Sequence, residues 1–111
     1  MKILIDENLP LKLKESFGEG HAVFSARELN WHGKKNGELL ELMTLAGFEG
    51  FVTMDKNLPS QQNLTNLAIS IFVLRGINNK LDTLTDLVPL VLAEIEQGVG
   101  FGVIEISLSP T

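Results

Sequence analysis

Apolar residues along this chain alternate between short strand-like runs and longer stretches with helical spacing. Four runs have the length and composition of strands, at 2–5, 21–25, 50–54 and 68–74. The last of these is almost entirely apolar, which is typical of a strand covered on both faces. A fifth run at 101–108 alternates apolar and polar residues, which predicts an edge strand. The pattern therefore predicts five strands.

The segments between these runs carry helix signals. In the first segment, Asn8 has the chemistry of an N-cap, and Pro10 falls in the first turn, where its missing N–H costs nothing. In the last segment, Pro89 is expected to kink the helix or divide it in two. The predicted helices are 9–17, 36–46 and 82–97, with a turn or short helix at 57–66.

This alternation of strands and helices predicts a single α/β domain covering residues 1–111, with a mostly parallel sheet and helices on both faces. Loops that leave parallel strands emerge at the same edge of the sheet. The polar residues that follow each strand are therefore expected to gather at one edge.

Two stretches of the chain repeat each other, 2–10 and 50–59, and both end in Asp-x-Asn-Leu-Pro. The repeat places Asp6 and Asp55 after two strands that we expect to be neighbours. Paired carboxylates at a sheet edge suit Mg²⁺ or Mn²⁺, which prefer oxygen ligands. We therefore predict a shared cation site. The alternative for each Asp is a structural role, in which it accepts backbone N–H groups at a helix start.

Other polar residues near this edge are secondary candidates. Glu38, in the first turn of the second helix, could reach the edge as an auxiliary ligand. Glu7 is either a further ligand or, more simply, a surface charge. Thr53 points to the same side of the sheet as Asp55, where its hydroxyl would position water or phosphate, or would bond to backbone. Asn8 and Asn57 are most simply N-caps, although an amide oxygen could complete a metal shell. Asn36, at the start of the second helix, is a further auxiliary candidate.

Charge and composition change this picture only in part. A net charge of −5 argues against a protein that coats nucleic acid by bulk electrostatics. Five of the nine basic residues nevertheless fall at the predicted edge, either as a basic rim or as solvated lysines: Lys34, Lys35, Lys56, Arg75 and Lys80.

Arg75 would clamp a phosphate or cap its strand against Asp82, for which N-capping is the simplest role. Trp31 and His32 lie on a polar loop, where partner contact or loop packing is expected. The two histidines lack ligand spacing, so no zinc site is expected.

Several function classes are excluded or disfavoured by composition. The chain has no cysteine, which excludes disulfides and thiolate metal sites. It has no apolar run of about 18 residues, so no membrane span is expected. The start of the chain lacks the pattern of a signal peptide, so a cytoplasmic location is expected.

Four features of the chain together resemble the small bacterial PIN-like proteins of the DUF5615 type. They are residues 1–10, the Gly-His-x-Val motif at 20–23, the helix at 36–46 and the Val-Thr-Met-Asp-Lys-Asn segment at 52–57. These are distant relatives of the toxin ribonucleases of toxin–antitoxin pairs. The resemblance implies a PIN-like three-layer α/β/α sandwich around a mostly parallel sheet of about five strands. It also implies RNA cleavage with Mg²⁺ or Mn²⁺ held by three or four acids at the carboxyl edge of the strands.

On this chain the resemblance implies Asp6, Asp55 and Glu38 as catalytic and metal-binding residues, with Glu7 as a further ligand. The implied RNA contacts are Lys34, Lys35, Lys56 and Arg75. Similar proteins usually carry Asp where Asn36 stands, and often where Asn57 stands. Two ionised ligands are thus replaced by neutral amides, which weakens a hard-cation site.

Two functions follow from these features. The first is a metal-dependent ribonuclease, the toxin component of a toxin–antitoxin-like module. The second is a PIN-like protein that has lost catalysis and binds an antitoxin-like partner or forms a homodimer, as the amides at 36 and 57, the acidic pI and an exposed Trp31 suggest. A phosphoacceptor domain of the receiver type fits less well, because the chain has no full acidic pair after its first strand and no Lys after its last.

Overall fold

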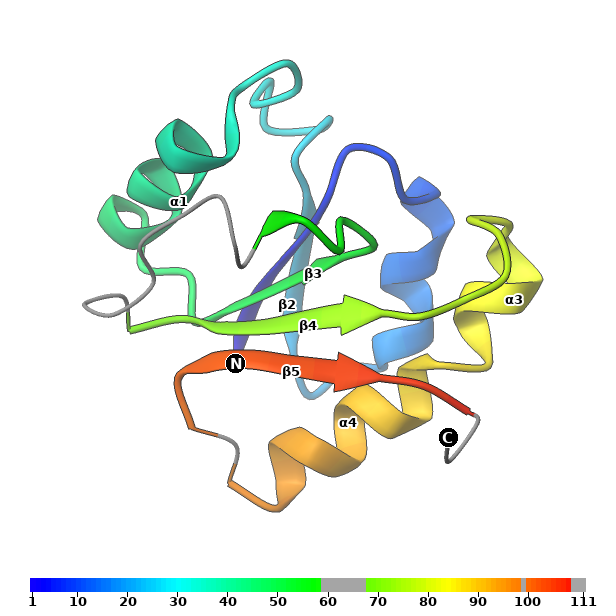
Figure 1. Cartoon of the computed structure of the whole chain (residues 1–111). Helices are drawn as coiled ribbons and strands as arrows, with labels where there is room; N and C mark the ends of the chain where they lie inside the picture. Colours follow the sequence, from blue (N-terminus) through cyan, green and yellow to red (C-terminus); the bar gives the residue numbers. More distant parts are fainter. Residues whose placement is uncertain (59–67, 99, 109–111) are drawn as a thin grey trace.

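A computed structural model describes residues 1–58, 68–98 and 100–108, apart from the side chain of Asn36. Five strands form one sheet in the order β2-β1-β3-β4-β5, and each neighbouring pair is parallel (Figure 1). The strands are β1 (Lys2–Ile5), β2 (Ala22–Ser25), β3 (Gly50–Thr53), β4 (Ser70–Leu74) and β5 (Gly102–Ile106). The predicted α/β fold with a parallel sheet is confirmed.

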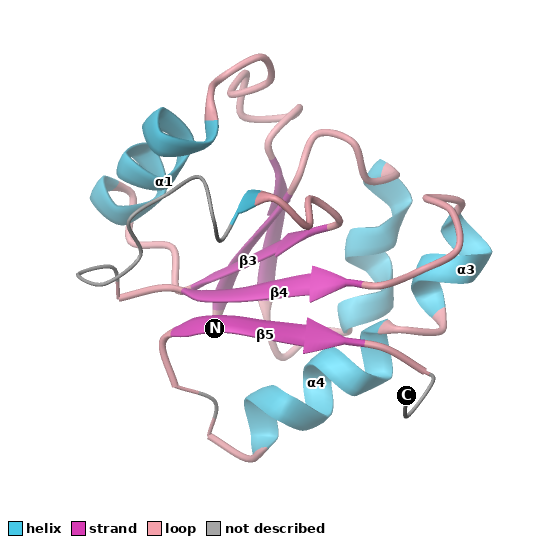
Figure 2. Cartoon of the chain, viewed as in Figure 1, coloured by secondary structure: helices cyan, strands magenta, loops and turns pink. Residues whose placement is uncertain are grey.

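Helices lie between the strands in sequence and cover both faces of the sheet, giving three layers (Figure 2). The described helices are the 3₁₀ helix η1 (Leu11–Phe17), α1 (Asn36–Leu45), α3 (Leu81–Thr85) and α4 (Val88–Glu96). The turn or short helix predicted at 57–66 falls almost entirely in 59–67, outside the described residues. Within the described ranges, no helix is long and apolar enough to span a membrane.

Each face of the sheet has its own apolar core. The face covered by η1, α3 and α4 includes Ile3, Leu13, Phe72, Leu87 and Val91. The face covered by α1 includes Leu4, Leu39, Met43, Phe51 and Ile71. All five residues of β4 are buried, as the continuous apolar run predicts for a strand covered on both sides.

Pro89 divides the long helix that the sequence predicts. The helix α3 ends at Thr85, and α4 begins at Val88 with Pro89 in its first turn. Proline has no N–H to bond back to the preceding turn, but in a first turn that donor has no helical partner to lose. A break into two short helices is therefore the arrangement that keeps the remaining backbone bonds.

The predicted N-caps at Asn8 and Asp82 are wrong. The helix η1 begins at Leu11, and Pro10 occupies the cap position with an extended ψ of 136°. Asn8 instead lies in the turn after β1. At α3 the cap is Lys80, and Asp82 sits inside the first turn, where its Oδ1 accepts the N–H of Thr83 at 2.9 Å.

The strand order places a topological switch point between β1 and β3. The chain runs from β1 to one neighbour, β2, and then returns across to the other neighbour, β3. In sheets of this kind the loops leaving the two central strands turn to opposite faces, and a crevice opens at their carboxyl ends. Asp6 and Asp55 follow these two strands.

Candidate functional site

Asp6 is anchored beside β3 at the end of β1. Its backbone N–H donates to the carbonyl of Val52 at 2.9 Å, which extends the β1–β3 ladder one residue beyond the strand. Its carboxylate makes two further contacts. Oδ1 accepts the N–H of Glu7 at 2.8 Å, and Oδ2 accepts the hydroxyl of Thr53 at 2.7 Å. The carboxylate is therefore held in one orientation by the next residue of its own loop and by the last residue of β3.

Thr53 joins the two loops through one buried hydroxyl. Its Oγ1 donates to Asp6 and accepts the N–H of Asp55 at 3.1 Å. The sequence predicted either a water-positioning or a backbone-bonded hydroxyl for this residue, and the bond to the Asp6 carboxylate was not foreseen. Thr53 thus couples the position of Asp6 to that of Asp55.

Asp6 and Asp55 line one cavity of about 320 Å³ at the carboxyl ends of β1 and β3, together with Glu7, Asn8 and Met54. Both Asp residues are half-buried. Oδ1 of Asp55 accepts the N–H of Asn57 at 2.9 Å. The structure therefore brings together the two carboxylates that the repeat pointed to, and they come from adjacent strands.

Burial raises the pKa of Asp6 above its ordinary value. The hydrogen bonds from Thr53 and from the N–H of Glu7 lower this pKa, while the charges of Glu7 and Asp55 raise it further. An ionised Asp6 is thus a partly desolvated anion beside two other anions. A bound cation would offset both the desolvation and the repulsion.

The raised pKa of Asp6 predicts a specific dependence of stability on pH. Between the ordinary and the raised pKa the folded chain binds more protons than the unfolded chain, so the free energy of unfolding falls as pH rises through this window. Asp6→Asn removes this titrating group and with it this contribution to the free energy of unfolding. In urea unfolding experiments, the stability of Asp6→Asn relative to wild type should therefore increase as pH rises from below the ordinary Asp pKa through the raised pKa of Asp6. A relative stability that decreased with pH would contradict the assignment.

A second prediction concerns Thr53. Thr53→Val removes the hydroxyl and leaves Oδ2 of Asp6 and the N–H of Asp55 without this partner. Loss of such buried bonds lowers the free energy of unfolding by about 1–3 kcal/mol. Thr53→Ser keeps the hydroxyl and is the matched control, so urea unfolding should show a clearly smaller loss. Equal losses in the two variants would mean that the hydroxyl does not link the loops.

Glu7 lines the cavity, but its carboxylate is bonded elsewhere. Both of its oxygens accept the N–H of Gly33 at 3.1 Å, and its carbonyl accepts Nε of Arg27 at 2.7 Å. Glu7, Arg27 and His32 also line a neighbouring cavity of about 300 Å³. Glu7 therefore ties the loop after β1 to the loop after β2. Nothing in the sequence signalled this role for Arg27.

Glu38 does not line the Asp6–Asp55 cavity. It is exposed on α1, with its Oε1 4.0 Å from Nζ of Lys34, and an exposed i,i+4 pair of this kind contributes little to stability. Across residues 1–58, 68–98 and 100–108, no group of three or more His, Asp or Glu side chains is arranged to hold a metal ion. Two carboxylates, rather than the three or four that the resemblance implies, converge here in the described part of the chain.

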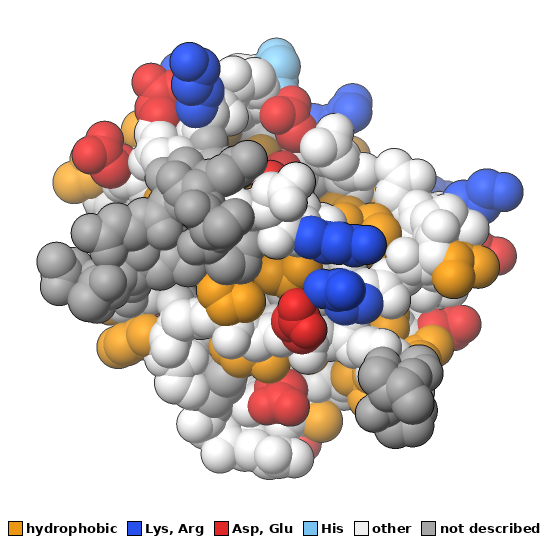
Figure 3. All heavy atoms as spheres, viewed as in Figure 1, with side chains coloured by type: hydrophobic (Ala, Val, Ile, Leu, Met, Phe, Trp, Pro, Cys, Tyr) orange, Lys and Arg blue, Asp and Glu red, His pale blue; other side chains and the backbone are white. Residues whose placement is uncertain are grey.

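On the face drawn in Figure 3, acidic and basic side chains lie interspersed. Lys35 and Lys56 are exposed. The prediction that Arg75 caps its strand against Asp82 is wrong, because Arg75 Nη1 contacts Glu105 Oε1 at 2.8 Å. This ion pair links the ends of β4 and β5.

Trp31 is not the exposed side chain that the sequence suggested. It is half-buried and packs edge-on against Phe48, with ring centroids 5.8 Å apart. Its backbone N–H donates to the carbonyl of Ala26 at 2.8 Å. Loop packing, the second of the two roles considered, therefore accounts for Trp31.

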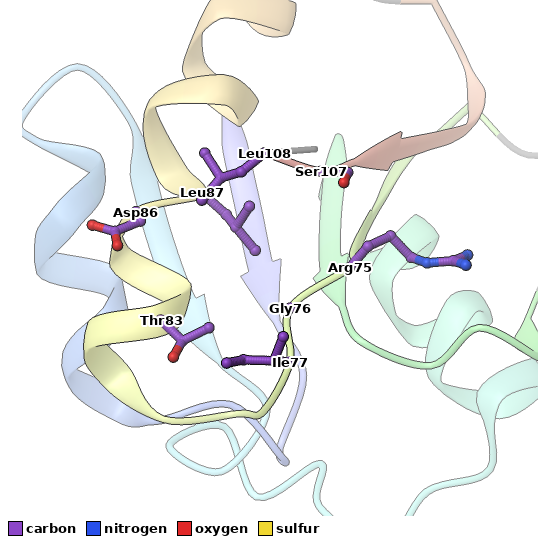
Figure 4. A pocket seen from close by; sticks show the side chains of 8 residues that line it. All are labelled: Arg75, Gly76, Ile77, Thr83, Asp86, Leu87, Ser107 and Leu108. Atoms are coloured by element: carbon purple, nitrogen blue, oxygen red, sulfur yellow. The ribbon is translucent and has the colours of Figure 1, made fainter. Parts of the chain in front are cut away.

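A separate cavity of about 330 Å³ lies between the loop after β4, the helix α3 and the residues that follow β5 (Figure 4). Ile77, Leu87 and Leu108 give it apolar walls, and Arg75 and Asp86 are also among its lining residues. The sequence did not indicate Ile77, Leu87 and Leu108 as site residues, because apolar side chains in and beside loops carry no chemical signature. The cavity has no described carboxylate pair and differs in character from the Asp6–Asp55 site.

Comparisons of the chain with protein-family models, with curated proteins and with solved structures found no match. The resemblance to PIN-like proteins stays a prediction.

Proposed function

We propose that Asp6 and Asp55 bind one Mg²⁺ or Mn²⁺ at the carboxyl ends of β1 and β3, and that the chain hydrolyses RNA phosphodiester bonds there. It would act in the cytoplasm as the toxin component of a toxin–antitoxin-like module. One observation carries the proposal: two carboxylates from adjacent strands line the same cavity at the switch point of a parallel sheet. The RNA substrate and the toxin role rest on the resemblance.

The donor set fits a weak site for a hard dication. Mg²⁺ is commonly bound by one or two carboxylates, with waters and substrate phosphates filling the remaining positions. Each Asp6 oxygen accepts one described hydrogen bond, and a carboxylate oxygen has capacity for more than one contact. Thr53 would act on a bound cation indirectly, by holding the Asp6 carboxylate in place.

When bound, the cation would supply charge stabilisation at the phosphoryl oxygens and lower the pKa of a water molecule. The chain itself contributes orientation. Asp6 and Asp55 would hold the cation, and the hydroxyl of Thr53 connects the two residues. The proposed contacts to the RNA backbone are Lys34, Lys35, Lys56 and Arg75. To bind a phosphate, Arg75 would have to give up its ion pair with Glu105.

A second function is favoured by the placement of the other acids. Both oxygens of Glu7 accept the N–H of Gly33, and Glu38 does not line the cavity, so neither carboxylate is placed as a third ligand beside Asp6 and Asp55. A PIN-like protein that has lost catalysis would also be expected to keep fewer converging carboxylates than an active one, as the described residues do here. In this alternative the chain binds an antitoxin-like protein or a second copy of itself.

Cleavage of a single-stranded RNA of mixed sequence tests the proposed activity. We expect the purified chain to cleave it with Mn²⁺ or Mg²⁺ and not with EDTA, and Asp55→Asn to abolish the cleavage. Cleavage that persists in EDTA, or that survives in Asp55→Asn, would exclude the proposed chemistry. No cleavage with either metal would favour the partner-binding alternative.

A further inference from the structure

The strand β5 forms an open edge of the sheet. It pairs only with β4, in a ladder bounded by the bonds from Gly102 N–H to the carbonyl of Ile69 and from Arg75 N–H to the carbonyl of Ile106. In this parallel ladder alternate residues face β4, so the N–H and C=O groups of Val103 and Glu105 point away from the sheet. Among the described residues, these backbone groups have no hydrogen-bond partner.

The opposite edge of the sheet is closed in part by its own chain. At the end of β2 the N–H of Ser25 donates to Oε1 of Glu28 at 2.8 Å. The carbonyl of Ser25 accepts the N–H groups of Glu28 and Leu29 at 3.1 Å and 3.3 Å. Natural sheets commonly block their edges in this way, because unpaired strand edges are templates for other strands. Only β2 has this protection in the described structure.

Apolar side chains flank the open edge at both ends. Phe101, just before β5, is 71% exposed, and Leu108, two residues after it, is 63% exposed. Within the strand, Val103 is 38% exposed. Unpaired backbone groups between exposed apolar side chains are the combination that favours strand addition.

We propose that a second copy of this chain pairs with β5 in antiparallel orientation, about a twofold axis at Ile104. This register sets Val103 of each copy opposite Glu105 of the other, so that their outward backbone groups exchange both hydrogen bonds. It also brings the exposed Phe101 end of each strand against the Ser107–Leu108 end of the other. Each copy thus satisfies the outward backbone groups of the other without placing like charges opposite each other, so a second copy of the chain closes both edges at once.

The two neighbouring symmetric registers fit less well. An axis at Glu105 would place the two Glu105 carboxylates directly opposite each other, and like charges in that position are destabilising. An axis at Val103 would set Phe101 opposite Glu105 and leave Leu108 beyond the paired region. Because a single short strand gives a small interface, we expect a weak dimer, with a dissociation constant between about 1 µM and 1 mM.

Two charge substitutions at Val103 test both the edge and the register. In the proposed register, Val103→Lys sets a cation opposite Glu105 of the other copy, and Val103→Glu sets an anion there. Sedimentation equilibrium of the full chain should show the dimer tightened by Val103→Lys and weakened by Val103→Glu. Each change should be about two- to thirty-fold in the dissociation constant, since two symmetric pairs are affected.

Leu45 provides the matched control. It is exposed at the end of α1, outside β5, and Leu45→Lys and Leu45→Glu change net charge in the same way. Neither should alter the dissociation constant by more than the general charge effect. Thermal unfolding of each variant verifies that it is folded.

Three results would overturn the proposal. If the chain were monomeric up to about 1 mM, pairing of two copies through β5 would be excluded, and any strand that pairs with β5 would have to come from a different protein. A dimer that Val103→Lys weakens as much as Val103→Glu would exclude the register. A dimer that neither substitution changes would place the interface elsewhere on the chain.

Discussion

Asp6→Asn is expected to abolish the binding of Mn²⁺, and with it the proposed cleavage, while the chain stays folded. The substitution removes one of the two anionic ligands. It keeps the oxygen that accepts the N–H of Glu7, and the new amide can donate to Oγ1 of Thr53. Cation affinity should fall by at least about 100-fold, because even a group that only orients a ligand is worth about 10- to 100-fold.

Asp82→Asn is the matched control for this experiment. Asp82 also uses its Oδ1 to accept the N–H of the next residue, but it lies on α3 and does not line the cavity. Its substitution should leave Mn²⁺ binding unchanged. If Asp6→Asn bound Mn²⁺ as tightly as wild type, Asp6 would have a structural role only, as an acceptor for the two loops.

Phe51→Ala is expected to cause the largest loss of stability. Phe51 lies in β3, is 1% exposed and packs in the apolar cluster beneath α1. Truncating a buried Phe to Ala costs about 3–5 kcal/mol, partly because the cavity left behind cannot fully collapse. A chain of this size has a total stability of about 5–15 kcal/mol, so the variant should be close to unfolding. Urea unfolding monitored by circular dichroism measures the loss.

Phe101→Ala is the control for the core assignment. Phe101 is 71% exposed, so its truncation should change the free energy of unfolding by less than about 0.5 kcal/mol. The comparison is made at low protein concentration, where the proposed dimer does not contribute. If the two variants lost similar stability, the core beneath α1 would not be the packed layer that the structure shows.

The strands could be predicted because their signals are local and strong. Consecutive apolar residues form most of β1 and β4 and the middle of β3, and Pro89 acts on its own turn whatever surrounds it. The start of η1 could not be predicted in the same way. Asn8 and Pro10 both have helix-start chemistry, and the competing turn after β1, in which Leu9 N–H donates to the Asp6 carbonyl, is equally local.

The candidate site was predictable only where strand order determines it. Asp6 and Asp55 meet because β1 and β3 are neighbours, which the repeat and the alternation of elements suggest. The partners of Glu7 and Arg75 depend on loops and strands remote in sequence, Gly33 and Glu105. The link through Thr53 depends on the β1–β3 register, which no local pattern encodes.

Calorimetric titration of Mn²⁺ into wild type, Asp6→Asn, Asp55→Asn and the double variant tests the central claim most directly. If the two carboxylates form one site, wild type binds one Mn²⁺ saturably and each single substitution removes nearly as much affinity as both together. The claim would be contradicted if wild type bound no Mn²⁺ at millimolar concentration. It would also be contradicted if the two substitutions had independent, additive effects, because the carboxylates would then not share a cation.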